Sequence, residues 1–192
     1  MANKPLDTTL LDKAIIFAVK AHSGTERRGK GFPYIVHPME AMEIVATITN
    51  DQGLLAAAAL HDTVEDTPVT IGMIREEFGD RVAELVEAES DVFVDGISEE
   101  DSWHVRKKAA LERLMKATRE VKIVALGDKL SNMRAIARDY AEQGDGFWNL
   151  FHVKNKADHE WRYRGLVEAF RDLKGTAAFE EFEGLVDQVF NN

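Results

Sequence analysis

Residues 54–67 read LLAAAALHDTVEDT, an apolar run that ends in ionisable side chains. The apolar part consists of good helix formers and predicts a buried helix of about two turns rather than an amphipathic surface helix. If one helix spans the whole stretch, residues four apart stack, so that His61 lies above Glu65 and Asp62 above Asp66. Carboxylates this close repel one another and raise their pKa values, and a bound cation relieves the repulsion.

The alternative for residues 54–67 is a solvated, frayed helix end before Pro68. A short motif of this kind carries limited information alone, and we expect the two interpretations to be about equally common. The rest of the chain must decide between them.

The composition is that of one globular domain. The chain has 192 residues, of which 45% are hydrophobic and 30% charged, and we expect a single domain over residues 1–192. It has no cysteine, so disulfides and thiolate metal sites are excluded, and metal ligands must come from six histidines and the acids. A net charge of −10 argues against general nucleic-acid binding. Without a signal-peptide pattern or an apolar run of about 20 residues, we expect a cytoplasmic protein and no membrane partner.

Helical spacing dominates the pattern of apolar residues and predicts an all-α fold, a bundle of about ten helices. Residues 121–126 also allow a strand because of their β-branched content, but the helical spacing continues beyond them and favours a helix. Residues 139–146 are expected to be a polar break. The predicted helices cover residues 8–22, 38–49, 54–67, 70–78, 80–90, 98–117, 121–138, 154–173 and 176–190.

Other chemically informative residues lie outside the central stretch. Asp128 is a second acid in an apolar helix, with Asn132 one turn further on. His37 lies in the N-cap region before Pro38, where a lone histidine is more often a structural hydrogen-bonding group than a ligand. The loop at 23–33 contains Arg27, Arg28, Lys30 and three glycines. It suits phosphate, although a solvated charged turn is the more common explanation.

Together, His37, His61, Asp62 and Asp128 offer two imidazoles and two carboxylates. Such donors suit Mn²⁺, Fe²⁺, Co²⁺ or Zn²⁺, and four protein ligands leave coordination positions open for water. A divalent ion can acidify that water into a nucleophile. Glu65 and Asp66, one turn further along, are placed to accept its proton.

With its order His…His-Asp…Asp, the chain resembles the HD-domain metal-dependent phosphohydrolases. It is most similar to the (p)ppGpp hydrolase domain of the RelA/SpoT homologues and the stand-alone small alarmone hydrolases. Residues 33–38 resemble the PYI-x-HP motif of that branch, 60–67 its LHD-x-x-EDT motif, 78–82 its FG-x-x-V segment and 126–134 its LAD-[RK]-L-x-NMR motif. The resemblance extends from about Ala14 to Phe170.

The resemblance implies a single HD-type helical domain that binds a divalent metal, most often Mn²⁺, and hydrolyses a small guanosine polyphosphate. Its implied activity is that of a (p)ppGpp 3′-pyrophosphohydrolase. The alternatives are a phosphatase for another nucleotide such as NADPH, or a non-catalytic nucleotide or metal sensor, which the intact Glu65-Asp66 pair disfavours. The implied metal ligands are His37, His61, Asp62 and Asp128; the water-activating pair is Glu65 and Asp66; the substrate contacts are Arg27, Arg28, Asn132 and an aromatic at Trp161 or Tyr163.

Several positions depart from the branch. Gly127 replaces the usual alanine, which we expect to matter little, and Ser131 replaces a commonly bulkier residue. Residues 91–103 match the branch poorly. Arg106 or Lys107, just after them, could supply the substrate-facing basic residue of the branch. Insertions near Lys30 and in 139–151 border the expected pocket. The remaining histidines, assigned to structure or surface, are His22, His104, His152 and His159.

Overall fold

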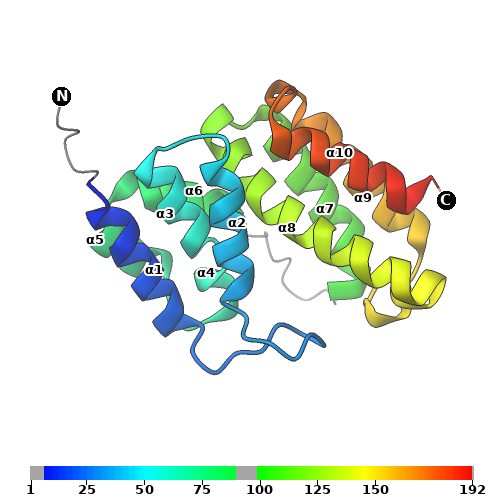
Figure 1. The fold of residues 1–192 in the computed structure, drawn as a ribbon, viewed down its shortest axis with the longest axis horizontal. Helices are drawn as coiled ribbons and strands as arrows, with labels where there is room; N and C mark the ends of the chain where they lie inside the picture. The colour runs from blue at the N-terminus through cyan, green and yellow to red at the C-terminus, as the bar shows by residue number, and fades with distance from the viewer. Residues whose placement is uncertain (1–6, 90–98, 192) are drawn as a thin grey trace.

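The computed structural model describes residues 7–89 and 99–191, and these residues form helices and no β-strand. The predicted all-α fold is confirmed (Figure 1). The α-helices are α1 (Thr9–Ala21), α2 (Val36–Ala46), α3 (Gln52–Leu60), α4 (Thr63–Asp66), α5 (Ile71–Phe78), α6 (Asp80–Glu89), α7 (Glu99–Lys116), α8 (Arg119–Gln143), α9 (Lys156–Ala169) and α10 (Ala177–Phe190). Two 3-10 helices are η1 (Gly144–Leu150) and η2 (Arg171–Leu173).

Helix α8 runs through the middle of the bundle (Figure 1). Its N-terminal side packs against α2, α3 and α6, and α10 and η1 pack against it from the other side. Helix α7 packs against α9, and α9 against α10. The site described below therefore lies between an early half of the chain and a late half that meet along α8.

Helix α3 is the centre of the early half, as its apolar sequence predicts. Every residue from Gly53 to Leu60 is buried, and α1, α2, α6 and α8 surround the helix. A helix that is buried on all sides has no face in contact with water and needs no polar residues. Each buried methylene group contributes about 0.8 kcal/mol to the stability of the fold.

The single helix predicted over residues 54–67 is wrong, because the chain turns at His61 and Asp62 between α3 and α4. Two side chains hydrogen-bond to backbone carbonyl oxygens that would accept from backbone amides in a continuous helix. Nδ1 of His61 lies 2.8 Å from the carbonyl oxygen of Ala58, and Oγ1 of Thr63 donates to that of Leu60 at 2.7 Å. These bonds compete with the backbone ladder and interrupt the helix at this point.

Other helix ends also differ from the prediction. Helix α2 begins at Val36, so His37 lies inside the first turn, and Pro38 is tolerated there because first-turn amides have no helical partner. Helix α8 continues through the polar residues from Asp139 and ends only at Gly144, whose φ of 59° is favourable for glycine. The predicted helix over residues 154–173 is α9 followed by η2.

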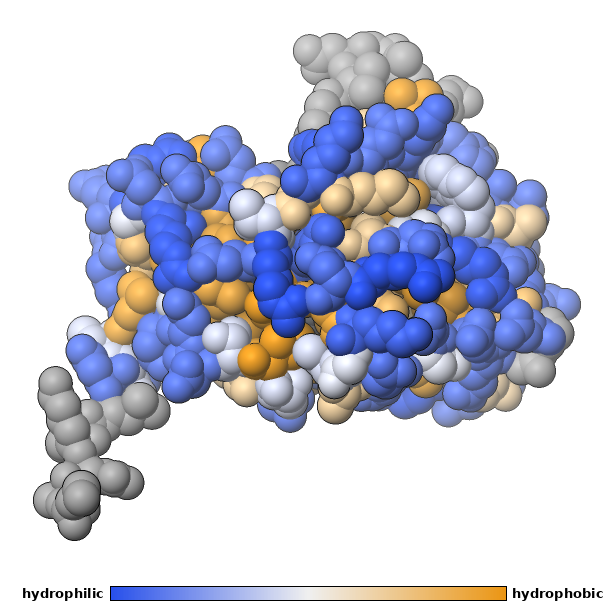
Figure 2. All heavy atoms as spheres, turned by 90° about the horizontal axis from the view of Figure 1, so that it is seen from above, coloured by the Kyte–Doolittle hydropathy of each residue, from blue (hydrophilic) through white to orange (hydrophobic). Residues whose placement is uncertain are grey.

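The surface is mostly hydrophilic on the face shown in Figure 2, with small apolar areas between charged side chains. None of the helices in the described part of the chain is both long enough and apolar enough to cross a membrane.

Candidate active site

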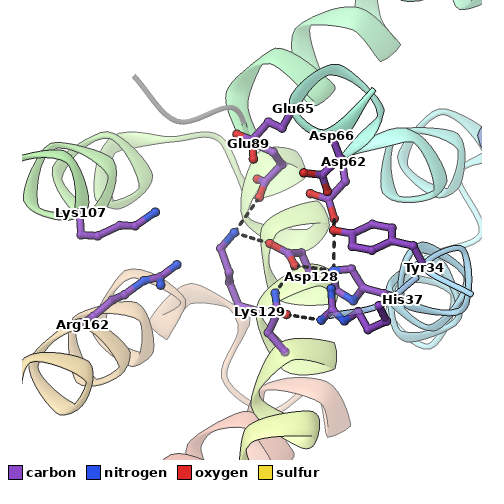
Figure 3. Close-up of a pocket in the computed structure, with 12 residues that line it drawn as sticks. Tyr34, His37, Asp62, Glu65, Asp66, Glu89, Lys107, Asp128, Lys129 and Arg162 are labelled. Carbon is purple, nitrogen blue, oxygen red and sulfur yellow. Dashed lines mark hydrogen bonds and ion pairs between the residues drawn. The ribbon is translucent and has the colours of Figure 1, made fainter. Parts of the chain in front are cut away.

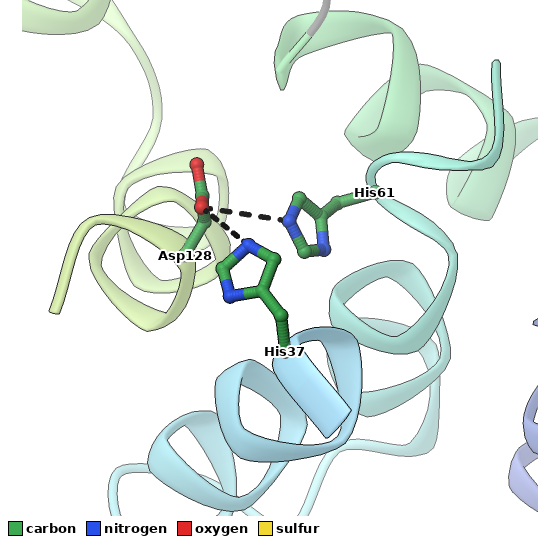
Figure 4. A group of neighbouring side chains, drawn as sticks. All are labelled: His37, His61 and Asp128. Carbon is green, nitrogen blue, oxygen red and sulfur yellow. Dashed lines mark ion pairs between the residues drawn. The ribbon is translucent and has the colours of Figure 1, made fainter. Parts of the chain in front are cut away.

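Four of the predicted side chains converge although they lie far apart in the sequence. Nε2 of His37 lies 3.1 Å from Oδ1 of Asp128 and 3.4 Å from Oδ2 of Asp62. Nε2 of His61 lies 3.0 Å from Oδ2 of Asp62 and 3.5 Å from Oδ1 of Asp128. Figure 4 shows His37, His61 and Asp128 pointing toward one another from α2, the turn after α3 and α8. One ligand atom from each of these three lies within 4.8 Å of the others.

The histidines are oriented by hydrogen bonds on the opposite side of each ring. His61 directs Nδ1 to the carbonyl of Ala58, which can only accept, so Nδ1 carries a proton. His37 directs Nδ1 to Oγ of Ser131 at 2.7 Å. In both rings Nε2 faces the carboxylates.

These donors fit a divalent cation. Nε2 of His61 is buried and, despite its short distance to Asp62, has no hydrogen-bond partner of acceptable geometry among the described residues. A buried imidazole nitrogen without a hydrogen bond, facing two carboxylates, matches the nitrogen and oxygen ligands of Mn²⁺, Fe²⁺, Co²⁺ or Zn²⁺.

The pKa values of Asp62 and Asp128 are both lowered; for Asp62 the sequence predicted a raised pKa because of the acids beside it. Burial opposes ionisation of Asp62, but the charge of His61 and the adjacent imidazole of His37 outweigh it and hold its pKa below the usual value. Burial likewise opposes ionisation of Asp128, but Lys129 and both histidines hold its pKa well below the usual value. For His61, burial lowers the pKa, but Asp62 and Asp128 more than reverse this effect. The charge of Asp128 still raises the pKa of Asp62, but the cationic and hydrogen-bonding groups around it outweigh this repulsion.

Tyr34 adds a hydrogen bond at the edge of this cluster. Its hydroxyl donates to Oδ2 of Asp62 at 2.6 Å. Burial and the nearby charge of Asp62 raise the pKa of the phenol, so it remains a donor at neutral pH. Tyr34 therefore helps to fix the orientation of Asp62.

A pocket of about 260 Å³ opens beside the four side chains. In Figure 3, Glu65, Asp66, Asp62 and Glu89 lie along one side, whereas Lys107 of α7 and Arg162 of α9 point toward it from the other. Its lining residues are Arg27, Tyr34, His37, Asp62, Glu65, Asp66, Glu89, Lys107, Asp128, Lys129, Asn132 and Arg162. This charge separation suits a ligand that bears phosphate near a cation.

Lys129 connects two acids at the floor of the pocket. Its ammonium pairs with Asp128 and lies 3.5 Å from Oε2 of Glu89. Burial raises the pKa of Glu89, and the charge of Lys129 only partly offsets this effect. Lys129 therefore compensates buried negative charge beside the four predicted metal ligands.

Asn132 connects the loop at 23–33 to Asp128. Its Nδ2 donates to Oδ1 of Asp128 at 2.5 Å, and its Oδ1 accepts from Nη2 of Arg27 at 2.6 Å. Arg27 also lies over the ring of Tyr34, 5.3 Å from its centroid. Arg28, in contrast, is exposed and does not line the pocket.

A second cavity of about 210 Å³ shares Arg27 and His37 with the first. The side chains of Phe32, Val36 and Arg138 also line it. Lys30 at its rim pairs with Asp139, so the two insertions expected near the pocket contact each other.

Neither of the predicted aromatic residues reaches the pocket. Trp161 is 40% exposed and packs against Trp103 and His104. Tyr163 is 4% exposed and stacks on Phe190 in the core. Successive helical residues are rotated by about 100°, so the helix face that directs Arg162 into the pocket turns both neighbours away from it.

Comparison with known proteins identifies the family. The profile described as HD domain matches residues 14–151, which is more than half of the chain. The chain belongs to the HD-domain family.

Curated relatives of this HD domain are much longer proteins. It is 37% identical over 129 residues to a guanosine-3′,5′-bis(diphosphate) 3′-pyrophosphohydrolase of Haemophilus influenzae, covering 63% of this chain and 18% of the relative. It is 34% identical over 139 residues to a protein of the same name from Aquifex aeolicus, covering 71% of this chain and 19% of the relative. The chain therefore spans less than a fifth of the length of these relatives.

Two solved structures share the fold of this HD domain. One is a metazoan ortholog of SpoT that hydrolyzes ppGpp, with a TM-score of 0.67 and 23% identity over 99% of this chain and 97% of that one. The other, from Listeria monocytogenes, has a TM-score of 0.70 and 26% identity over 81% of this chain and 99% of that one.

Four residues that line the pocket of this HD domain were not predicted from the sequence as site residues: Tyr34, Glu89, Lys129 and Arg162. Tyr34 and Lys129 lie inside motifs quoted for the resemblance, and that position was the available signal. Glu89 and Arg162 lie in helices that carry several other charged residues, and nothing in the sequence distinguishes a pocket charge from a solvated one. Of the two bases considered near 91–103, Lys107 lines the pocket, whereas Nε of Arg106 donates to Ser102. Residues 91–98 lie outside the described part of the chain.

Proposed function

We propose that this HD domain hydrolyses guanosine 3′,5′-polyphosphates of the (p)ppGpp type, releasing pyrophosphate and GDP or GTP. The observation that carries this proposal is the convergence of His37, His61, Asp62 and Asp128 beside a pocket with acids on one side and bases on the other. The names of the bacterial relatives and of the metazoan ortholog support it.

His37, His61, Asp62 and Asp128 would hold the divalent ion, for which Mn²⁺ is our expectation. When bound, such an ion supplies an acidified water and positive charge beside the phosphate. Glu65 and Asp66 line the pocket beside these ligands and would accept the proton of the attacking water. The bond between the ribose 3′-oxygen and phosphorus breaks, and the 3′-oxygen gains a proton.

Three cationic side chains would neutralise the polyphosphate. Lys107 and Arg162 face the acids across the pocket, and Arg27 lies where the two cavities join. Guanidinium groups bind phosphate oxygens in pairs, and positive charge near the reacting phosphorus stabilises the transition state. The second cavity, with Phe32 and Val36, would hold the nucleoside. A small nucleotide partner and a cytoplasmic location remain predictions.

The experiment is a product analysis of the Mn²⁺-loaded protein with ppGpp, NADPH and simple nucleotides. Pyrophosphate and GDP from ppGpp are expected. Phosphate from NADPH with no pyrophosphate from ppGpp would replace this proposal with a different nucleotide phosphatase, and no turnover of any substrate would favour a sensor.

Two variants separate metal binding from chemistry. Asp62→Asn should abolish both activity and the rise in melting temperature on adding Mn²⁺. Glu65→Ala should keep that rise while losing roughly 10²- to 10⁴-fold in kcat, the usual contribution of a general base. An unchanged rate in Glu65→Ala would remove Glu65 from the proposed role.

A further inference from the structure

A chain of side-chain contacts leads away from His37, on the side opposite the pocket carboxylates. Nδ1 of His37 lies 2.7 Å from Oγ of Ser131, and this hydroxyl donates to Oε2 of Glu40 at 2.7 Å. The other carboxylate oxygen of Glu40 accepts from Nη1 of Arg134 at 3.1 Å. His37 and Ser131 are 3% and 2% exposed, so water does not compete freely for these contacts.

The carboxylate of Glu40 determines which group donates in each hydrogen bond of this series. A carboxylate can only accept hydrogen bonds, and Glu40 also accepts from the guanidinium of Arg134 at 3.1 Å. The single hydroxyl proton of Ser131 is therefore committed to Glu40. Ser131 can then only accept from His37, so the ring proton of neutral His37 lies on Nδ1 and the lone pair lies on Nε2.

Arg134 anchors this chain to the far side of the bundle. Its Nε and Nη2 donate to the two carboxylate oxygens of Glu181 on α10 at 2.6 and 2.7 Å. The guanidinium is thus held in a bidentate pair while its Nη1 reaches Glu40. Because the guanidinium of Arg134 is held in place, it also fixes the carboxylate of Glu40, which accepts the hydrogen bond from Ser131.

We propose that Ser131 and Glu40 are positioning residues that hold His37 in the ring orientation and tautomer that can bind a metal. The inference rests on the proposed function, since it requires a metal at His37. Outer hydrogen bonds to a metal-ligating histidine typically change metal affinity by 10- to 100-fold.

His61 provides an internal comparison. It has the same orientation, but its Nδ1 proton goes to the backbone carbonyl of Ala58, which no substitution can remove. Nδ1 of His37 instead contacts a side chain, Ser131 of α8, which in turn contacts Glu40 of α2. Only one of the two histidines can therefore be tested by mutation of its acceptor.

The test measures the dissociation constant of Co²⁺ by its visible absorption, in the full chain. Ser131→Ala should weaken Co²⁺ binding by roughly 10- to 100-fold, and Glu40→Gln by less, because the amide still offers an oxygen but no charge. Glu43→Gln, an exposed acid on the same helix, is the matched control and should bind Co²⁺ like the wild type.

The double variant Ser131→Ala/Glu40→Gln shows whether Glu40 acts through Ser131. If it does, the double variant should bind Co²⁺ no more weakly than Ser131→Ala alone. Losses that add would show two separate local effects and would overturn the inference. So would wild-type affinity in either single variant. If Ser131→Ala does not fold, Glu40→Gln, with its partly exposed side chain, still gives this result.

The two proposals fail in different ways. A wild-type protein that binds no Co²⁺ overturns both. A wild-type protein that binds Co²⁺ and hydrolyses ppGpp, with variants that bind Co²⁺ equally well, overturns the positioning role alone. Loss of affinity in the variants without ppGpp hydrolysis by the wild type supports the positioning role and overturns the proposed substrate.

Discussion

Gly127 brings α8 close to α2 one residue before Asp128. A Cβ atom added at this position would lie 2.7 Å from the carbonyl oxygen of Ala41 and 2.8 Å from Cγ2 of Val45. The oxygen belongs to the backbone of α2 and cannot rotate away. The expectation that Gly127 in place of the usual alanine matters little is therefore wrong, because here the missing methyl group sets the distance between two helices that carry metal ligands.

We predict that Gly127→Ala lowers the free energy of unfolding by about 1–3 kcal/mol, the usual cost of overpacking, despite the better helix propensity of alanine. The measurement is urea unfolding of the metal-free protein. Gly184→Ala is the control, since Gly184 lies in α10 with no atom within 4 Å of an added Cβ, and it should stabilise by about 0.5–1 kcal/mol. A Gly127→Ala protein as stable as the wild type would show that α2 and α8 can separate freely.

Helix α3 depends on its N-cap, because its own residues offer almost no polar group. Oδ1 of Asp51 accepts from the amides of Gly53 and Leu54 at 2.8 and 3.2 Å. Arg81 of α6 donates to both carboxylate oxygens of Asp51 at 2.9 and 3.0 Å. The same carboxylate thus caps the N-terminus of α3 and links α3 to α6. The C-terminal end of α3 leads into the turn that carries His61 and Asp62.

We predict that Asp51→Ala destabilises the protein by about 1 kcal/mol, because it removes the cap. Asp51→Asn should cost less, since the amide oxygen still caps the helix and an ion pair this exposed contributes little. Thermal unfolding of both variants checks the order, and equal losses would show that the ion pair matters more than the cap.

The pH dependence of Asp51→Asn adds a second check. The hydrogen bond from Arg81 lowers the pKa of Asp51 in the folded protein, so its charge stabilises the fold above the ordinary pKa of 3.8. This advantage over Asp51→Asn should be constant from pH 7 to about pH 5 and should disappear as the pH falls through the lowered pKa.

The two halves of the molecule contribute opposite charges to one pocket. Asp62, Glu65 and Asp66 come from the early half, whereas Lys107 and Arg162 come from α7 and α9 on the other side of α8. A phosphate ligand would therefore contact both halves at once. Loss of a base from the late half should weaken substrate binding without removing the metal.

We predict that Lys107→Ala raises the KM for ppGpp by roughly tenfold or more, since a hydrogen bond between charged groups contributes about 1.5–3 kcal/mol. The affinity for Mn²⁺ should not change. Lys108→Ala, an exposed lysine on the same helix, is the matched control and should leave KM unchanged. Steady-state kinetics together with a Mn²⁺ titration check both expectations. Equal KM values in the two variants would exclude Lys107 from the phosphate contacts.

The sequence alone was sufficient to predict the all-α class, most helix boundaries and the side chains that converge as candidate metal ligands. Helical spacing and capping are local, and an acid or histidine inside an apolar helix stands out against its neighbours. Thr70 and Thr176, for example, cap α5 and α10 through their own side chains, each within three residues.

What only the tertiary structure decided depends on neighbours from other elements. The lowered pKa values of Asp62 and Asp128 and the direction of Arg162 rather than Trp161 into the pocket depend on hydrogen bonds, charges and packing. So does the contact of Ser131 with Glu40, which lies 91 residues away in the sequence. Such contacts arise only when the helices pack, because no local pattern specifies which side chain of a distant helix will face a given atom.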